Sequence, residues 1–247
     1  MRLALALIIG SLLNVSGFGV NEDPSLTAAR KARNHGDTQT LKHEIENAEG
    51  SASETKSFEA YLRLALLQDW MCEAAEAGND KQLQKHAAEA GVAAAEVAIR
   101  LNPDSSQAHQ LLADLLGQLA PLVMGGGMKY GQRSTNEADR AIELDPENAD
   151  AYVTRGISYL YTPEAFGGDK KKAVDCFTRA VHLAPGLDTP HIWLALFNLE
   201  AEKFDDALRE INEARRLNPE RGFSQEVFQE ISSARKKSIN TRGKDKL

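Results

Sequence analysis

Two short glycine runs are the first residues that could do chemistry, because such loops can bind phosphate. One run is Phe166-Gly167-Gly168-Asp169-Lys170, and the other is Gly125-Gly126-Gly127-Met128-Lys129. A phosphate-binding loop requires the spacing GxxxxGK[ST] after a strand, and a dinucleotide-binding loop requires GxGxxG. Neither run has either spacing, so we predict that both are turns between helices.

Other catalytic patterns are incomplete. In the stretch HEIEN, which begins at His43, Asn47 stands where a zinc-binding helix needs a second histidine. The stretch GISYL from Gly156 ends in Leu160 and so lacks the second glycine of a serine nucleophile motif. The sequence therefore predicts no catalytic residue, no metal ligand and no cofactor, and we do not expect an enzyme.

One phrase, A-x-x-L-x-P, recurs four times along the chain, at 98–103, 141–146, 180–185 and 214–219. Alanine and leucine three residues apart share a helix face, and the proline prevents the helix from continuing. Asn102, Asp145 and Asn218, which precede three of the prolines, are residue types that permit a left-handed exit from a helix. Polar residues after each proline are expected to cap the next helix.

A small residue follows each of the first three prolines by ten positions: Ala113, Gly156 and Ala195. Ala65 holds the equivalent place in the first unit. Small side chains at fixed positions let two antiparallel helices approach closely. Together with the proline-ended phrase, this pattern resembles the tetratricopeptide repeat (TPR), a two-helix unit of about 34 residues.

The resemblance implies an all-α fold, an α-solenoid of stacked helix hairpins. A stripe of Leu41, Ile45 and Ala48, with Asp37 or Thr38 as a cap, predicts a further helical pair before the first repeat. The expected segments are a signal peptide or anchor (1–19), the N-terminal helical pair (20–56), four TPR-like units (57–104, 105–147, 148–187 and 188–221), a capping helix (222–234) and a basic disordered tail (235–247).

The four units become shorter along the chain. The spacing from the small residue to the alanine of the closing phrase is 33 residues in the first unit and then 28, 24 and 19. We expect part of the excess to lengthen helices and the rest to form loops, which gives a tapered stack. These uneven units are similar to those of exported bacterial TPR proteins, of the lipoprotein component of TRAP-type transporters, and of the regulator of microtubule dynamics family.

The TPR resemblance implies that the first helix of each unit lines a concave face. On that face we expect Trp70, Gln110, Asp114 and Gln118 to contact a partner, with burial by neighbouring helices as the open alternative for Trp70. Along the edge formed by the turns, an apolar rim is expected from Met128, Tyr130, Tyr161 and Phe166. Each of these side chains could instead fold back over its own helices.

The N-terminus is typical of an exported protein. Met1-Arg2 precedes an apolar run from Leu3 to Leu13, which is short for a membrane span and is followed by small residues suited to cleavage after Gly17. An uncleaved anchor is the alternative, and it would be the chain's only association with a membrane. We therefore expect a periplasmic or otherwise extracytoplasmic protein.

Charge and cysteine content exclude some partners and cross-links. A net charge of −7 gives no reason to expect nucleic acid. Cys72 and Cys176 fall in non-neighbouring units, so we expect no disulfide between them. The resulting hypothesis is a non-catalytic scaffold that binds a protein or peptide, or, alternatively, an accessory of a solute transport system that binds a small apolar ligand.

Overall fold

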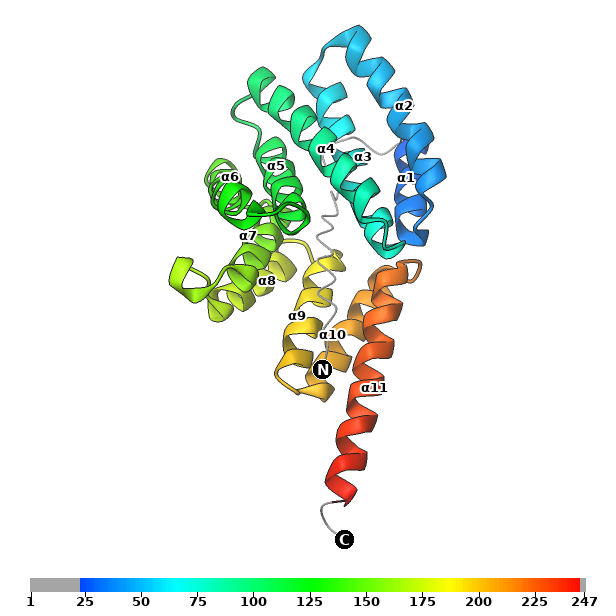
Figure 1. Ribbon diagram of the computed structural model, residues 1–247, viewed down its shortest axis with the longest axis vertical. Coiled ribbons are helices and arrows are strands. Elements are labelled where there is room, and N and C mark those ends of the chain that lie inside the picture. The colour runs from blue at the N-terminus through cyan, green and yellow to red at the C-terminus, as the bar shows by residue number, and fades with distance from the viewer. Residues whose placement is uncertain (1–22, 245–247) are drawn as a thin grey trace.

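The computed structural model describes residues 23–244, with side chains described to residue 239. All regular elements in this range are helices, as the sequence predicts (Figure 1). The predicted signal segment, 1–19, and the last three residues of the predicted tail lie outside the described residues.

Two helices precede the repeats, α1 (Pro24–His35) and α2 (Thr38–Thr55). The carboxylate of Asp37 caps α2 by accepting hydrogen bonds from the backbone N–H groups of Gln39 and Thr40. Leu41, Ile45 and Ala48 are buried on one stripe of α2. A helical pair thus precedes the repeats, and of the two expected caps Asp37 is the one that caps α2.

Four antiparallel hairpins follow, and each pairs a first helix with a second helix. They are α3 (Phe58–Ala77) with α4 (Lys81–Leu101), α5 (Ser106–Leu119) with α6 (Gln132–Leu144), α7 (Ala149–Tyr161) with α8 (Lys170–Leu183), and α9 (Thr189–Glu200) with α10 (Phe204–Leu217). Short helical turns occupy the second and third hairpin loops: η1 (Ala120–Leu122), η2 (Gly127–Gly131) and η3 (Glu164–Phe166).

The repeated phrase ends each second helix by a local hydrogen bond. The N–H of the residue before the proline donates to the carbonyl of the phrase's alanine, as from Asn102 to Ala98 at 2.8 Å. The φ angles of Asn102, Asp145 and Asn218 are −141°, −143° and −136°. The expected left-handed exit is therefore wrong, because the following proline forces its predecessor into extended backbone.

The small residues do bring the helices together. Ala65, Ala113 and Ala195 are fully buried. At Gly156 an added Cβ would lie 2.5 Å from a ring carbon of Phe177 on α8, which leaves no room for a side chain. Phe177 in turn stacks on Trp193 of α9 with ring centroids 6.1 Å apart, so this contact joins the third unit to the fourth.

The taper takes two forms. In the first unit the extra residues lengthen both helices, since α3 has 20 residues and α4 has 21. The later repeat helices have 12 to 14 residues, and the excess of the second and third units lies in the loops that contain η1, η2 and η3. Both parts of the expected division, longer helices and longer loops, are therefore present.

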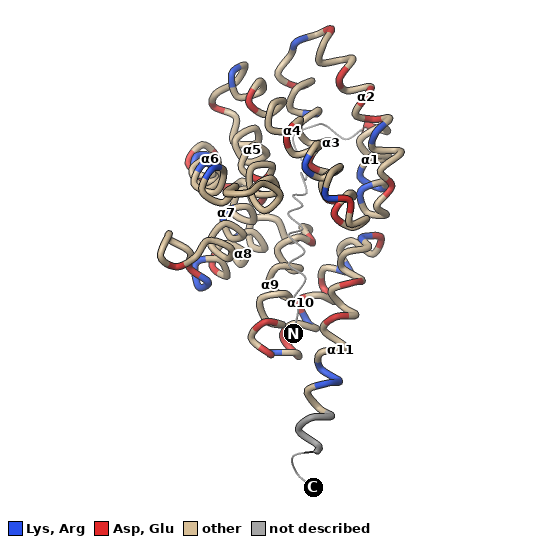
Figure 2. Tube along the Cα trace, viewed as in Figure 1, with Lys and Arg blue, Asp and Glu red and all other residues tan. Residues whose placement is uncertain are grey.

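A final helix, α11 (Gly222–Lys244), packs on α10 and α9. It continues past residue 234, where the sequence analysis placed a disordered tail. The helix persists because neither proline nor glycine interrupts residues 223–242, and Arg235 pairs with Asp205 of α10 at 2.7 Å. Acidic positions also precede basic ones along α11 (Figure 2), an order that suits the helix dipole. For the described part of that segment, the disordered assignment is therefore replaced by helix.

The stack curves so strongly that its two ends meet. The start of α11 lies beside the end of α1 (Figure 1). There the side-chain N–H of Asn34 donates to the amide oxygen of Asn218 at 3.3 Å, and a Cβ at Gly222 would lie 3.3 Å from the carbonyl oxygen of Asn34. The described chain is therefore a closed arch, and the inner faces of its first helices point toward one another.

Candidate functional site

The inner faces of α3, α5 and α7 carry polar residues at helical spacing. Residues four apart project from one side of a helix, and this side faces the inside of the arch. The row comprises Asp69 and Glu73 on α3, Gln110, Asp114 and Gln118 on α5, and Asp150 and Thr154 on α7, all of which are buried. We call these residues the inner row.

Hydrogen bonds connect the inner row from helix to helix. The amide of Gln118 donates to Asp69 at 2.6 Å, which links α5 to α3. The hydroxyl of Thr154 donates to Asp114 at 2.6 Å, which links α7 to α5, and Gln110 donates to the other oxygen of Asp114 at 2.5 Å. These bonds fix the lateral register of three successive repeats.

Burial changes the ionisation of this row. It raises the pKa of Asp69 well above its ordinary value, and the nearby Asp114 and Glu73 carboxylates raise it further. Arg33 and the Gln118 amide act in the opposite direction without offsetting this effect. Asp69 therefore retains its proton at a pH where an exposed aspartate would be charged.

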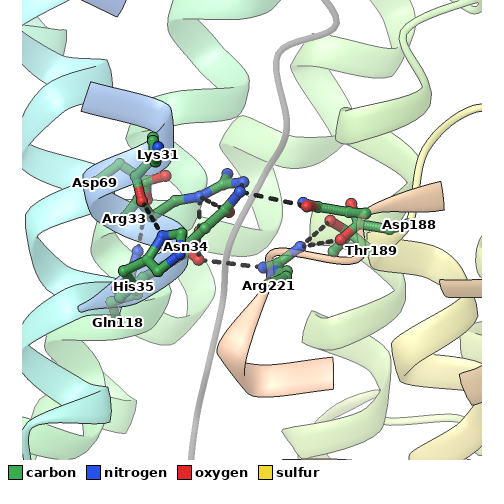
Figure 3. Close-up of polar contacts among 11 residues, drawn as sticks. Lys31, Arg33, Asn34, His35, Asp69, Gln118, Asp188, Thr189 and Arg221 are labelled. Atoms are coloured by element: carbon green, nitrogen blue, oxygen red, sulfur yellow. Dashed lines mark hydrogen bonds and ion pairs between the residues drawn. The ribbon is translucent and has the colours of Figure 1, made fainter. Parts of the chain in front are cut away.

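A second group of polar residues joins the two ends of the chain. We call Arg33, Glu73, Asp188, Thr189 and Arg221 the closing cluster, and Figure 3 labels all of them except Glu73. The Arg221 guanidinium donates to Asp188 at 3.1 Å, to Thr189 at 3.0 Å and to Glu73 at 3.1 Å. The side chain just before α11 thus binds the start of α9 and the C-terminal part of α3.

Arg33 completes the cluster from α1. Its Nε lies 3.8 Å from Glu73, and its guanidinium carbon lies 5.4 Å from the ring centre of Trp70. Burial lowers the pKa of Arg33, although Glu73 opposes that shift. Burial acts in the same direction on Arg221, but Asp188 and Glu73 more than offset it, so the pKa of Arg221 is raised.

Several buried polar atoms of these groups have no hydrogen-bond partner. They are Nη1 of Arg33, Nε of Arg221, Oε1 of Glu73, Oδ1 of Asp188, Nε1 of Trp70, and Oε1 of both Gln110 and Gln118. Buried polar atoms are normally paired, because leaving one unpaired costs about 1–3 kcal/mol. These atoms are enclosed by the surrounding side chains, so their missing hydrogen bonds are a cost of closing the arch.

The four residues predicted for the concave face share one environment, the interior. Gln110, Asp114 and Gln118 belong to the inner row, and Trp70 is buried beside Arg33. For Trp70 the alternative of burial is the one observed. The structure brings Gln110 together with Asp114, and Gln118 with Asp69, but presents none of the four to a partner.

The residues predicted for the turn edge have a different environment. Met128 is 90% exposed and Phe166 is 79% exposed, while Tyr130 is half-buried and packs against the core of the first units. Met124, which the sequence analysis did not single out, is fully exposed in the same loop as Met128. The turns therefore expose large apolar side chains where the concave face does not.

Tyr161 stands between the two environments. Its side chain is 38% exposed, and its ring meets the edge of Trp193 with centroids 6.0 Å apart. Burial raises the pKa of Tyr161 to about 12, with Glu76 and Glu200 adding to the effect. Tyr161 thus joins the apolar contact with α9 and also lies near two carboxylates.

The glycine run at 166–170 is a turn, as predicted, whereas in the run at 125–129 only Gly125 is a turn residue and the rest is helical, with Gly127–Gly131 forming η2. Gly167 has a φ of 93°, and a Cβ on Gly168 would lie 1.7 Å from the carbonyl oxygen of Thr162. Asp169 then caps α8 by accepting from the N–H groups of Lys171 and Lys172. The N–H groups that could hold a phosphate are satisfied by the chain's own carboxylate.

Sequence reasoning missed the closing cluster. Asp188 follows Pro185 and is therefore one of the polar residues expected to cap the next helix, but its carboxylate binds Arg221 and makes no capping bond. A signal for Asp69 and Glu73 existed, because two acids four residues apart interrupt the otherwise apolar run LALLQDWMCEAA. Nothing in the local sequence around Arg221 indicates its partners.

The described residues hold neither a cluster of metal ligands nor a membrane-spanning helix. Within residues 23–244 no three histidine, cysteine or acidic side chains are placed to hold a metal ion. No helix in the same range is long and apolar enough to span a membrane. Cys72 and Cys176 are free thiols, and burial raises the pKa of Cys176 to about 11.

The curved stack of hairpins defines this chain as a TPR-type α-solenoid. Residues 26–162, just over half of its 247 residues, match the family described as Regulator of microtubule dynamics protein 1-3. The chain belongs to that family. No curated protein sequence matches the chain.

Two solved structures are similar to this chain. TTC0263, a thermophilic TPR protein of Thermus thermophilus, is 17% identical, with a TM-score of 0.63, and the match covers 85% of this chain and 97% of that one. The TPR protein YrrB is 14% identical, with a TM-score of 0.44, over 84% of this chain and 98% of that one. At these identities the similarity to TTC0263 shows the fold alone.

We predict that Arg221→Ala strongly destabilises the protein. The substitution leaves the buried carboxylates of Glu73 and Asp188 without their cation, and such a loss costs about 3–5 kcal/mol. The free energy of unfolding is to be measured by urea denaturation followed by circular dichroism. The stability of Arg221→Lys should lie between those of the wild type and Arg221→Ala, because an ammonium group keeps the charge but not the forked geometry.

The matched control is Arg209→Ala on α10. Arg209 pairs with Asp206 at 2.8 Å, but its side chain is 68% exposed, so its removal should hardly change the urea midpoint. Equal effects of the Arg221 and Arg209 substitutions would show that the closing cluster does not stabilise the arch.

The raised pKa of Glu76 on α3 predicts that the stability of the protein depends on pH. Burial, with Glu73 adding to it, raises its pKa from 4.5 to about 8. Between those values the folded state holds a proton that the unfolded state lacks, so stability falls as pH rises from about 4.5 to about 8. Glu76→Gln should therefore stabilise the protein at pH 8 and have little effect near pH 4.5.

Urea midpoints of the wild type and of Glu76→Gln at pH 4.5, 6 and 8 measure this effect. Glu46→Gln, an exposed substitution on α2, is the control and should shift the midpoint equally at each pH. A Glu76→Gln curve parallel to the wild type across this range would contradict the raised pKa.

Proposed function

We propose that this protein is a non-catalytic scaffold that binds a protein or peptide partner through its turn edge, defined as Met124, Met128 and Phe166. The observation that carries the proposal is the exposure of these side chains. Met128 is 90% exposed, Phe166 is 79% exposed, and Met124 is fully exposed. Exposed apolar side chains that gather on one edge mark interaction sites.

Repeat geometry supports the grouping. The turns of successive units lie along one edge of a solenoid, so the loop of the second unit and that of the third belong to the same side. Methionine suits such a surface, because its flexible and polarisable side chain adapts to different partners. Lys129, Lys171 and Lys172 are exposed in or just after these turns, which favours a partner with acidic residues beside its apolar ones.

Binding through the concave face remains the alternative for Trp70, Gln110, Asp114 and Gln118. These residues are buried, so a partner could reach them only if the arch opened at the closing cluster. The role of an accessory to a transport system rests on sequence resemblance alone. The exposed turn residues favour the scaffold. A family named for the regulation of microtubule dynamics also accords with a role that is exercised through contacts with other proteins.

The turn edge can be tested by site-specific photo-crosslinking. A photoreactive amino acid at position 128 or 166 should capture a partner that mass spectrometry identifies, and Met124→Ser/Met128→Ser/Phe166→Ser should weaken binding of that purified partner at least tenfold. Helicity should stay unchanged, since the three side chains are exposed.

Leu101 supplies the control for the turn edge. It is 48% exposed but lies at the end of α4, outside the turns. A photoreactive residue at position 101 should not capture the partner, and Leu101→Ser should leave its affinity unchanged. Equal capture from positions 101 and 128 would refute the turn edge as the docking site.

We also propose that residues 1–19 export the protein, either as a cleaved signal or as an uncleaved anchor. The support is the order of charge, apolar run and small residues in that segment. A tag at the C-terminus should resist protease added to intact cells and become sensitive when the outermost membrane alone is opened, a treatment that leaves a cytosolic marker protected. N-terminal sequencing of the mature protein then separates cleavage from anchoring. A tag that behaves like a cytosolic marker would contradict export.

A further inference from the structure

Two methionines of the turn edge are exposed in a single loop. Met124 is fully exposed and Met128 is 90% exposed, so solvent reaches the thioether groups of both side chains. Met71 on α3, by contrast, is only 4% exposed. The chain's fourth methionine, Met1, lies outside the described residues. Among the described methionines, a dissolved reagent therefore has free access to the pair in the loop.

The loop is anchored on both sides of the exposed pair. Val123 and Tyr130, which flank the two methionines in the sequence, pack against the core of the first units. Between the methionines the backbone lies against the end of the preceding helix, since a Cβ on Gly126 would lie 2.2 Å from the carbonyl oxygen of Ala120. A chemical change confined to the two exposed side chains can therefore leave the fold as it is.

The two cysteines do not compete strongly for an oxidant. Peroxides oxidise the thiolate form of cysteine, and susceptibility also requires exposure. Cys72 is fully buried, and burial raises its pKa well above the ordinary value. Burial also raises the pKa of Cys176 to about 11. Both groups therefore remain thiols near neutral pH, which leaves the exposed thioethers as the favoured targets among the described residues.

We propose that Met124 and Met128 are a reversible oxidation site, which takes hydrogen peroxide or an organic hydroperoxide and regulates the turn edge; the regulation rests on the scaffold function proposed above. The sulfur lone pair attacks one peroxide oxygen, so that a sulfur–oxygen bond forms and the oxygen–oxygen bond breaks. The sulfur loses two electrons, and the leaving hydroxide or alkoxide takes up a proton. A methionine sulfoxide reductase reverses the step, since its thiols supply two electrons and the oxygen leaves as water.

Oxidation places polar groups where the partner is expected to dock. A sulfoxide oxygen accepts hydrogen bonds from water, so burying it against an apolar partner costs more than burying a thioether. After oxidation, Phe166 alone of the three turn-edge residues keeps its apolar side chain. The reduced edge is therefore the form that docks.

Peroxide treatment of the purified protein at pH 7, followed by peptide mass spectrometry, tests the oxidation site. Met124 and Met128 should reach half conversion at least tenfold sooner than Met71, because burial shields Met71. The circular dichroism spectrum should not change while the exposed pair is converted. Equal rates for the three methionines, or loss of helicity in step with oxidation of the pair, would overturn the proposal.

Retention on phenyl-agarose measures the apolar character of the edge without a partner. The oxidised protein should elute earlier than the reduced protein, and methionine sulfoxide reductases A and B together should restore its retention. Met124→Leu/Met128→Leu stays apolar but resists oxidation, so peroxide should leave its retention unchanged. Met71→Leu, a substitution of similar volume in the core, is the matched control and should still lose retention. An equal loss in the double leucine variant would place the effect elsewhere and refute the site.

The partner captured from position 166 tests the regulation. Its affinity for the wild type should fall at least tenfold on oxidation and should stay constant for Met124→Leu/Met128→Leu. Equal affinities for the reduced and oxidised wild type would contradict the regulation and leave the scaffold function standing. Failure of the scaffold function has a different signature, because the reduced protein then captures no partner from positions 128 and 166, and the regulation falls with it.

Discussion

The structure depends on a buried ion pair between residues far apart in the sequence. Arg221 reaches across the interior to Glu73, 148 residues earlier, and at the same time binds Asp188. Burying a charge is costly unless an opposite charge and hydrogen bonds compensate it. Here each charge is compensated only when α1, α3, α9 and α11 all occupy their places, so the ion pair specifies the closed arch more than it adds net stability.

The inner row follows from the same constraint. Because the arch turns its first helices inward, side chains that would line an open groove in a shallower solenoid are packed against one another. Gln118 with Asp69, and Thr154 with Asp114, replace contacts that a bound peptide would otherwise make. The exposed apolar side chains of the turns lie outside this buried row.

Local features of the fold could be predicted from the sequence because their causes are local. Each A-x-x-L-x-P phrase contains its own helix end, and Asp37 and Asp169 sit beside the N–H groups that they cap. Gly156 and Ala113 marked helix crossings because only small residues fit there. The extended backbone at Asn102 could also have been predicted, because proline restricts the residue before it. The left-handed exit was expected instead because asparagine permits it.

The closing cluster could not be predicted in the same way. Its partners come from α1, α3, α9 and α11, and their meeting depends on the curvature summed over all the hairpins. A small change in the angle at each crossing would separate Arg221 from Glu73 without changing any repeat motif. Trp70 illustrates the same limit, since its position on the inner face was predictable but its burial beside Arg33 required the curvature.

Contact between the ends changes how such a molecule loses its structure. In an open solenoid each unit touches only its neighbours, so terminal repeats can fray while the middle stays folded. Because α11 contacts α1, and Arg221 just before α11 binds Glu73 of α3, neither end of the arch is free to unravel alone. The repeats are then expected to melt as one cooperative unit, with a chain-closure step of long sequence separation that slows folding relative to the hairpins themselves.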